Sequence, residues 1–422
     1  MEYTRQGRRR VVITGMSAIT ALGQLKETWE GLKAGRSGVS RIEVSFEYPP
    51  DFDVQIAGEI KDFDPLKYGI NPKEARRMAR SSQMAVAATN LLLDDAGLTV
   101  DQIRAEGERV GVVVGSSMAG HDMAQKLTRE WKDRGHKLPS PFGLVSSLPN
   151  MPAYYVSQAI GALGPFSALS TACATGTQVL GDAAELIRTC RADMIIAGGV
   201  ESIITDYCIA GFAAMKALPT SYNDRPAEAS RPFDADREGF VCSEGVAMMV
   251  LESLEHAEAR GARVYAEVLG HASSSDAFHF AAPDPEGAGA ARAMRWALQD
   301  AGVNPEDISY INAHGSSTPL NDKIETLAIK KVFGDHAYKV PISSTKSMLG
   351  HLLGGAGTIE AAACVMSLVE QVIHPTINYH TPDPECDLDY VPNVARDARV
   401  EACLSNSFGL GGQNACVVIG RI

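Results

Sequence analysis

Short, continuous apolar runs alternate along this chain with alanine-rich stretches of helical periodicity. Each run suits one buried strand, and the runs cover residues 10–16, 109–117, 192–202, 245–253, 264–274, 308–317 and 415–422. Strands that are apolar on both faces are typical of parallel or mixed sheets with helices on both sides. A helix is expected after the first run, near residues 25–34. The alternation therefore predicts an α/β fold.

The pattern contains an internal echo at about half the length of the chain. Residues 167–190 indicate a strand, a sharp turn and a helix, and residues 340–370 indicate the same order, with glycines opening an alanine-rich helix. No linker rich in Pro, Gly or Ser divides the chain. Such self-similarity is typical of repeated units that pack against each other. We therefore predict two similar halves, residues 1–257 and 258–422, packed into one body.

The charge of the chain excludes some classes of partner. Its 39 Lys and Arg against 51 Asp and Glu give a net charge of −12. An acidic molecule has no general attraction for nucleic acid or anionic lipid, so an acidic partner must meet a local basic patch. No apolar run reaches the ~18 residues of a membrane span. The run after Arg8–Arg10 resembles a secretory leader, but polar residues interrupt it and favour a first buried strand.

The eight cysteines indicate a reducing compartment. No two of them have the Cys-x-x-Cys spacing of a zinc or redox site, and most lie in apolar runs, where a free thiol acts as a small hydrophobic group. A disulfide framework is not expected. The cysteine usage therefore favours the cytoplasm.

Cys173, in the segment STACATG, is the first candidate for chemistry. It lies between an extended segment that ends near Thr171 and a helix predicted from Gly176 to Cys190. Backbone N–H groups and the positive end of a helix dipole favour a thiolate at such a turn, and the thiolate is the form that attacks carbonyls. Most cysteines are inert and buried, but the small residues around Cys173 leave room for a substrate.

His314 and His351 each follow an apolar strand and lie beside glycine. Two such histidines with one such cysteine suggest nucleophilic catalysis with proton transfer or oxyanion stabilisation. A zinc site is disfavoured, because the spacings match no metal motif. Lys346, just before His351, needs a carboxylate partner if it is buried, and Glu325 or Glu360 could supply it.

The segment NSFGLGGQNA, residues 406–415, carries Gly409, Gly411 and Gly412. It fits neither a dinucleotide-binding motif nor a phosphate loop, so nucleotide binding is not expected. We interpret it as a turn that brings backbone N–H groups near a reacting carbonyl, with Phe408 as an apolar wall.

Together these segments identify a family resemblance. TACATG, NAHGSSTPLND, STKSMLGHLLGGAG, NSFGLGG, ASRPFDADREGFV and SSDAFH closely resemble the beta-ketoacyl-[acyl carrier protein] synthases, above all the elongating condensing enzymes of bacterial fatty acid synthesis. The resemblance extends from VVITGMSAITALG to VVIGRI. It implies the thiolase fold, in which two βαβαβαββ halves form five α/β/α/β/α layers, and it implies a homodimer.

The resemblance also implies the roles of single residues. Cys173 would accept the acyl chain from the phosphopantetheine arm of the carrier, and no cofactor would be bound by the enzyme itself. His314 and His351, both neutral, would hold the malonyl thioester and promote its decarboxylation. Lys346 would be an orienting residue paired with Glu325. The backbone N–H groups of Cys173 and Phe408 would form the oxyanion hole, and Phe408 would gate malonyl entry.

Further positions match binding residues of the family. Ser316, Thr318 and Gly409 would contact the substrate arm, and Met118 would line the floor of the acyl pocket, where an unbranched side chain yields to longer chains. Asn312, Glu360 and an expected turn at Ser405–Asn406 match a structural site for a monovalent cation. The sequence departs from the family pattern at Ser316, where the hydroxyl is kept, and at Leu349, Leu410 and Gln413, which bear on gating and chain-length preference.

The carrier protein is acidic, so the basic segment NPKEARRMARSS is the expected docking site. Lys73, Arg76, Arg77 and Arg80 would lie near one helix face, and the competing interpretation is a solvated basic helix. A thiolase, a ketosynthase of a polyketide or aryl polyene pathway, and a chain-length-factor subunit remain as alternatives. The second histidine disfavours a thiolase, and the retained Cys173 disfavours a chain-length-factor subunit. The motifs do not separate a polyketide ketosynthase from a fatty acid enzyme.

Overall fold

A mixed sheet of eleven strands runs through the computed structural model, which describes residues 8–43, 52–137 and 140–422. The main strands of the first half are β1 Val11–Thr20, β5 Val110–Gly115, β6 Phe166–Leu169, β7 Met194–Glu201 and β8 Gly245–Ser253. Those of the second half are β9 Ala266–Ser275, β10 Tyr310–Asn312, β11 Ile342–Ser343, β14 Ala402–Gly409 and β15 Gln413–Gly420. All seven predicted strand runs therefore form strands.

The two halves have the same strand order. Counting the five main strands of each half along the chain, the first lies beside the fifth, followed by the fourth, the second and the third. The strand directions also match. In each half the second, third and fourth strands are parallel to one another, and the fifth strand is antiparallel to both of its neighbours, the first and the fourth. Short antiparallel pairing between β1 and β9 joins the halves. The echo in the sequence is thus a repeated topology, and the predicted boundary at residue 257 lies within α10 (Leu254–Ala259).

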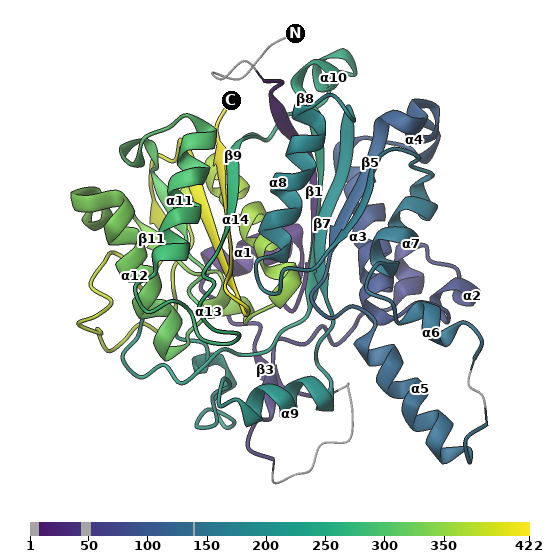
Figure 1. The fold of residues 1–422 in the computed structure, drawn as a ribbon, viewed down its shortest axis with the longest axis horizontal. Coiled ribbons are helices and arrows are strands. Elements are labelled where there is room, and N and C mark those ends of the chain that lie inside the picture. The colour runs from purple at the N-terminus through teal and green to yellow at the C-terminus, as the bar shows by residue number, and fades with distance from the viewer. Residues whose placement is uncertain (1–7, 44–51, 138–139) are drawn as a thin grey trace.

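Helices form three layers around the two halves of the sheet (Figure 1). In the middle, α8 (Thr175–Arg188) and α14 (Ala356–Glu370) pack against each other and against strands of both halves. Outside the first half lie α3 (Arg80–Ala96) and α7 (Met151–Ile160), and outside the second half lie α11 (Ala288–Ala301) and α12 (Pro319–Phe333). The predicted α/β/α/β/α arrangement is confirmed.

Shorter elements complete the described chain. The helices are α1 Leu25–Lys33, α2 Pro72–Ala75, α4 Val100–Glu106, α5 His121–Asp133, α6 Gly143–Ser146, α9 Asp206–Ala214 and α13 Lys346–Leu349. The short strands are β2 Gly23–Gln24, β3 Ser40–Arg41, β4 Ile56–Ala57, β12 Val372–Ile373 and β13 Arg396–Asp397. The helix expected near residues 25–34 is α1.

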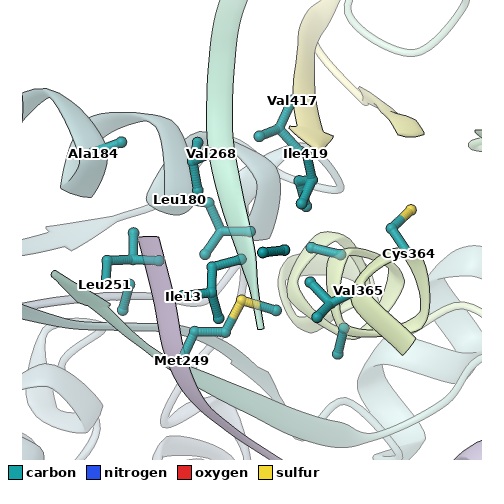
Figure 2. Packing of buried hydrophobic residues seen from close by; sticks show 14 of the residues in the cluster. Ile13, Leu180, Ala184, Met249, Leu251, Val268, Cys364, Val365, Val417 and Ile419 are labelled. Carbon is teal, nitrogen blue, oxygen red and sulfur yellow. The ribbon is translucent and has the colours of Figure 1, made fainter. Parts of the chain in front are cut away.

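The central core is built from both halves. Figure 2 shows apolar side chains of β1 and β8 meeting those of β9 and β15, with the inner faces of α8 and α14 between them. Leu180 and Val365 are fully buried here. This core crosses the boundary between the halves and joins the separate core clusters that lie within each half. The segment Leu353–Glu370 is apolar and long enough to cross a membrane, contrary to the expectation from the sequence, but 83% of it is buried inside the protein, as in a core helix.

The parallel strands place the candidate residues at one edge of the sheet. Cys173 follows β6, His314 follows β10, and Phe408 lies at the end of β14. His351 follows α13, which begins three residues after β11 ends. Loops after the carboxyl ends of parallel strands meet on one side of a sheet, so the two halves bring these residues together.

Candidate active site

One cavity of about 410 Å³ lies where the two halves meet. Cys173, His314, His351 and Phe408 all line it. The first comes from the amino-terminal half and the others from the carboxyl-terminal half. The structure therefore brings together the nucleophile, both histidines and the apolar wall predicted from the sequence.

Cys173 lies in a tight turn between β6 and α8. Ala172, directly before it, has a φ of 49°, a left-handed conformation that non-glycine residues seldom adopt. The turn is held by Thr175, whose hydroxyl accepts from the Thr171 N–H at 2.8 Å and donates to the Ala172 carbonyl at 2.7 Å. The side chain of Cys173 is thereby directed into the cavity that it lines.

The electrostatics of Cys173 differ from the prediction of a thiolate. Burial raises the pKa of Cys173 to about 11, although the Lys346 charge and a hydrogen bond from the Leu410 backbone N–H lower it. Desolvation outweighs the helix terminus because Cys173 is only 5% exposed. The resting nucleophile is therefore a thiol, and its proton must leave during acyl transfer.

The two histidines face each other at the cavity wall. Their ring centroids are 5.3 Å apart and the rings are nearly perpendicular, at 78°. Burial, followed by the charge of Lys346, lowers the pKa of both His314 and His351 well below the ordinary value, so both rings are neutral at pH 7. Nδ1 of His351 accepts from the Leu353 N–H at 3.2 Å, so its proton lies on Nε2. His351 therefore presents a fixed N–H donor.

Lys346 does not pair with Glu325, so that prediction is wrong. Its ammonium group donates to the His314 carbonyl at 2.7 Å and forms a buried ion pair with Glu360. The two oxygens of Glu325 instead accept the backbone N–H groups of His314 and Gly315, each at 2.8 Å. Because both oxygens of Glu325 already accept hydrogen bonds from the turn that carries His314, Lys346 pairs with Glu360 on α14 instead.

Glu325 still acts on the site through the backbone. Burial raises the pKa of Glu325 to about 7, and the N–H groups of Gly315 and His314 act against that rise. Asn406 also donates to this carboxylate, at 3.2 Å. Glu325 thus fixes the turn of His314 rather than the lysine.

Three buried oxygens fit the predicted cation site. Asn312 Oδ1, Glu360 Oε2 and Ser405 Oγ are buried and have no hydrogen-bond partner among the described residues. Oxygen donors that include one carboxylate suit a hard monovalent cation. Asn406 is occupied elsewhere, because its amide donates to Glu325 and its oxygen accepts from the Cys416 thiol. Ser405 and Asn406 lie on β14 rather than in a turn.

The glycine-rich segment closes over Cys173. A Cβ on Gly409 would lie 2.9 Å from the Thr171 carbonyl oxygen and 3.2 Å from the Cys173 backbone nitrogen, so only glycine permits this approach. Gly411 donates its N–H to the Phe280 carbonyl at 2.9 Å, and Asp276 donates its N–H to the Gly412 carbonyl at 2.8 Å. These bonds attach the turn to the segment after β9.

Ser316 and Thr318 also line the cavity, with their hydroxyls 2.9 Å apart. Met118 does not line it. Its sulfur lies 3.9 Å from Sγ of Cys208, in an apolar cluster that also contains Cys173, Phe240 and Leu353. Met118 therefore packs in the cluster that adjoins Cys173 rather than at the cavity wall.

The basic segment forms two elements rather than one helix face. Lys73 lies in α2 and Arg80 begins α3, with a break between them. Lys73, Arg76 and Arg77 are exposed. Arg80 is largely enclosed and donates to both oxygens of Glu244 at 2.7 Å, so its charge is not free for a partner. The structure therefore reduces the predicted docking set to three cations.

The sequence reasoning missed several residues around the site. The ring of Phe240 lies edge-on to His351 at 5.3 Å, and Leu353 both lines the cavity and donates its N–H to His351. Phe240 belongs to the segment ASRPFDADREGFV, which carries part of the family resemblance, so this motif could have identified Phe240 as a residue of the site. Glu201 and Cys208 lie in segments with no comparable motif, and only their place in the fold identifies them.

Two family models match the chain. The beta-ketoacyl synthase N-terminal domain matches residues 8–257, and the beta-ketoacyl synthase C-terminal domain matches residues 265–380. The chain is 46% identical to the 3-oxoacyl-[acyl-carrier-protein] synthase 2 of Synechocystis sp. over 96% of its length and 97% of the relative. It is 45% identical to the enzyme of the same name from Staphylococcus aureus strain COL, over 97% and 98%.

Solved structures give the same fold. A beta-ketoacyl synthase from Burkholderia phymatum has a TM-score of 0.90 at 37% identity, over 98% of this chain and all (100%) of that one. A type II polyketide ketosynthase bound to a hexaketide, in complex with its acyl-carrier protein, has a TM-score of 0.90 at 36% identity and the same coverage. These similarities extend over the whole repeated topology.

Proposed function

Because the chain belongs to the beta-ketoacyl synthase family, we propose that it elongates acyl chains in fatty acid synthesis as a 3-oxoacyl-[acyl-carrier-protein] synthase. Malonyl-carrier loses CO₂, and its remaining two carbons join an acyl group held on Cys173. One observation carries the mechanism: Cys173, His314, His351 and Phe408 line a single cavity. The chain is also more identical to the two fatty acid enzymes than to the polyketide ketosynthase, at 46% and 45% against 36%.

The first half-reaction is acyl transfer to Cys173. The sulfur attacks the thioester carbonyl of the acyl-carrier, the carbon–sulfur bond to the carrier breaks, and the proton of Cys173 passes to the released carrier thiol. The backbone N–H groups of Cys173 and Phe408 would hold the oxyanion of the tetrahedral intermediate. The close approach of Gly409 to the Cys173 nitrogen supports this arrangement.

The second half-reaction is decarboxylation followed by carbon–carbon bond formation. Loss of CO₂ leaves an enolate, whose oxygen would accept hydrogen bonds from His351 Nε2 and His314. Neutral histidines are suited to this, because they donate without first protonating the carbanion. The enolate carbon attacks the acyl carbonyl, the carbon–sulfur bond to Cys173 breaks, and the thiolate takes up one proton. Lys346 would orient His314 through its carbonyl.

The substrate arm would lie along Ser316, Thr318 and Gly409, and Phe408 would gate the entry of malonyl. Met118 would define the end of the acyl chain, because it lies in the apolar cluster that contains Cys173. A monovalent cation, if bound, would be held by Asn312, Glu360 and Ser405, where it would neutralise the second oxygen of Glu360. No other resident cofactor is proposed.

The proposed partner is an acidic acyl carrier protein, received by Lys73, Arg76 and Arg77. We also propose a homodimer in the cytoplasm. Its interface would use β6, an edge strand among the described residues, where Phe166 is 47% exposed and Leu163, three residues before it, is also exposed. An apolar edge strand of this kind needs a cover.

Mass spectrometry of reactions with malonyl-carrier and acyl-carriers of graded length tests the function. We expect a 3-oxoacyl product two carbons longer than the primer, and none with Cys173→Ala. Elongation of fatty acyl primers supports the fatty acid assignment, whereas exclusive use of poly-3-oxo primers would overturn it in favour of a polyketide pathway. The absence of an elongated product from every primer would refute the proposal.

A further inference from the structure

Glu201 is a buried carboxylate beside the active site that the reaction described above does not use. It lies at the end of β7 and is 0% exposed. Four groups donate to it: the Ser116 hydroxyl at 2.9 Å, and the backbone N–H groups of Ser117 at 2.9 Å, Met118 at 3.1 Å and Gly354 at 3.0 Å. Burial raises the pKa of Glu201, and these donors act against that rise. A carboxylate with this many donors acts as an acceptor on both oxygens.

The donors belong to two segments that serve different reaction steps. Ser116, Ser117 and Met118 follow β5, and the Ser117 hydroxyl donates to the Ala172 carbonyl at 2.8 Å. Ala172 is the left-handed residue that directs Cys173 into the cavity. This segment therefore connects Glu201 with the nucleophile and with Met118.

Gly354 belongs to the turn after His351. It directly follows Leu353, whose N–H fixes the proton of His351 on Nε2. Leu353 itself has a φ of 40°, so the turn is held in a strained conformation. A Cβ on Gly354 would lie 2.5 Å from the Ser117 nitrogen and 2.9 Å from a Glu201 oxygen, which shows how closely the two segments approach at the carboxylate.

We propose that Glu201 is a positioning residue that sets the nucleophile turn and the His351 turn at a fixed separation. One oxygen accepts from Ser117 and Gly354 together, so it joins the two segments directly. An amide cannot replace this carboxylate. Each Glu201 oxygen accepts at least one backbone N–H, so the NH₂ group of a glutamine, in either orientation, would place a donor against a donor. This role rests on the condensation proposed above.

The test compares Glu201→Gln with a matched control, Asp234→Asn. Asp234 is also 0% exposed and also accepts four hydrogen bonds, from Arg231 and from the backbone of Asp236, His380 and Thr381. The first measurement is the rate at which acyl-carrier loads Cys173 without malonyl-carrier, followed by intact mass. The second is CO₂ release in a single turnover of preloaded enzyme. Thermal unfolding is recorded for each variant.

We expect Glu201→Gln to slow both steps by about tenfold to a hundredfold at saturating substrate, as misplacement of reacting groups does. KM for the carriers should stay within about twofold, because the docking surface is unchanged. Asp234→Asn should lose stability and keep both rates per folded molecule. The pH profile of Cys173 alkylation gives a second signature: the Glu201 charge raises the pKa of Cys173, so its removal shifts the profile to lower pH although catalysis slows.

A second variant keeps the proposal testable if Glu201→Gln does not fold. Ser117→Ala removes the bond to the Ala172 carbonyl and leaves the Ser117 N–H on Glu201. It should slow acyl loading and spare CO₂ release. Rates of Glu201→Gln within about twofold of wild type, or equal loss of both steps in Ser117→Ala, would overturn the role of Glu201. If wild-type enzyme neither loads nor releases CO₂, the proposed function fails instead.

Discussion

Replacing Lys346 with methionine separates its two contributions, to stability and to catalysis. Lys346 and Glu360 are each 2% exposed at the side chain, and the ammonium group also satisfies the His314 carbonyl. Removing one partner of a buried ion pair costs about 3 to 5 kcal/mol, because the remaining charge has no partner. For 422 residues, the unfolding entropy is about 0.9 kcal/mol/K, so Tm should fall by about 3 to 6 °C.

The loss of stability should depend on pH in a definite direction. Burial raises the pKa of Glu360, and the Lys346 charge acts against that rise. Without the lysine, the folded-state pKa of Glu360 rises further above its unfolded value of 4.5. A raised carboxyl pKa costs nothing below the unfolded pKa and costs progressively more as the pH rises toward the folded pKa. The difference in Tm between wild type and variant should therefore be larger at pH 8 than at pH 5.

The double variant Lys346→Met with Glu360→Gln provides the control. It removes both buried charges, so much of the stability should return, while turnover should stay low because His314 has lost the group that orients its carbonyl. Tm by calorimetry at pH 5 and pH 8, with CO₂ release in a single turnover, measures both effects. A single variant with an unchanged Tm at pH 8, or a double variant with full turnover, would refute this reasoning.

Two further predictions concern substrates. Reversing Arg76 and Arg77 to glutamate should raise KM for acyl-carrier by about five- to tenfold at low salt and leave small acyl thioesters unaffected, whereas Arg399→Glu, at another exposed arginine, should change neither in steady-state kinetics. Equal losses on both substrates would indicate misfolding. Met118→Phe should shift the product profile toward shorter chains, and Cys208→Gly, which removes the sulfur packed on Met118, toward longer ones. An unchanged profile by mass spectrometry in both would show that the acyl chain ends elsewhere.

The sequence predicted the fold well because its signals were local. Buried strands are apolar on both faces, and the segments around Cys173 and Lys346 show the same strand, turn and helix, so the repeated topology follows from the pattern. Cys173, His314 and His351 were found because each lies beside glycine or other small residues; Cys173 and His314 follow strands as predicted, whereas a short helix, α13, separates His351 from β11.

Contacts between segments far apart in the chain could not be predicted in the same way. In the sequence, Glu325 and Glu360 are equally suitable partners for Lys346. Only the fold shows that the backbone N–H groups of His314 and Gly315 bind both oxygens of Glu325. The state of Cys173 was mispredicted because its burial depends on the facing half, which a helix terminus alone does not reveal. Arg80 was included in the docking patch because Glu244, its partner, lies 164 residues away.

The most direct test of the account is a labelled single turnover on the acyl-enzyme. Enzyme loaded with a fatty acyl group is mixed with malonyl-carrier that carries ¹³C in the two retained carbons. The account predicts loss of the acyl mass from the peptide containing Cys173, release of one CO₂, and a 3-oxoacyl product with both labelled carbons at its thioester end. Release of CO₂ while the acyl group stays on Cys173, or an acyl group found on any other residue, would contradict it.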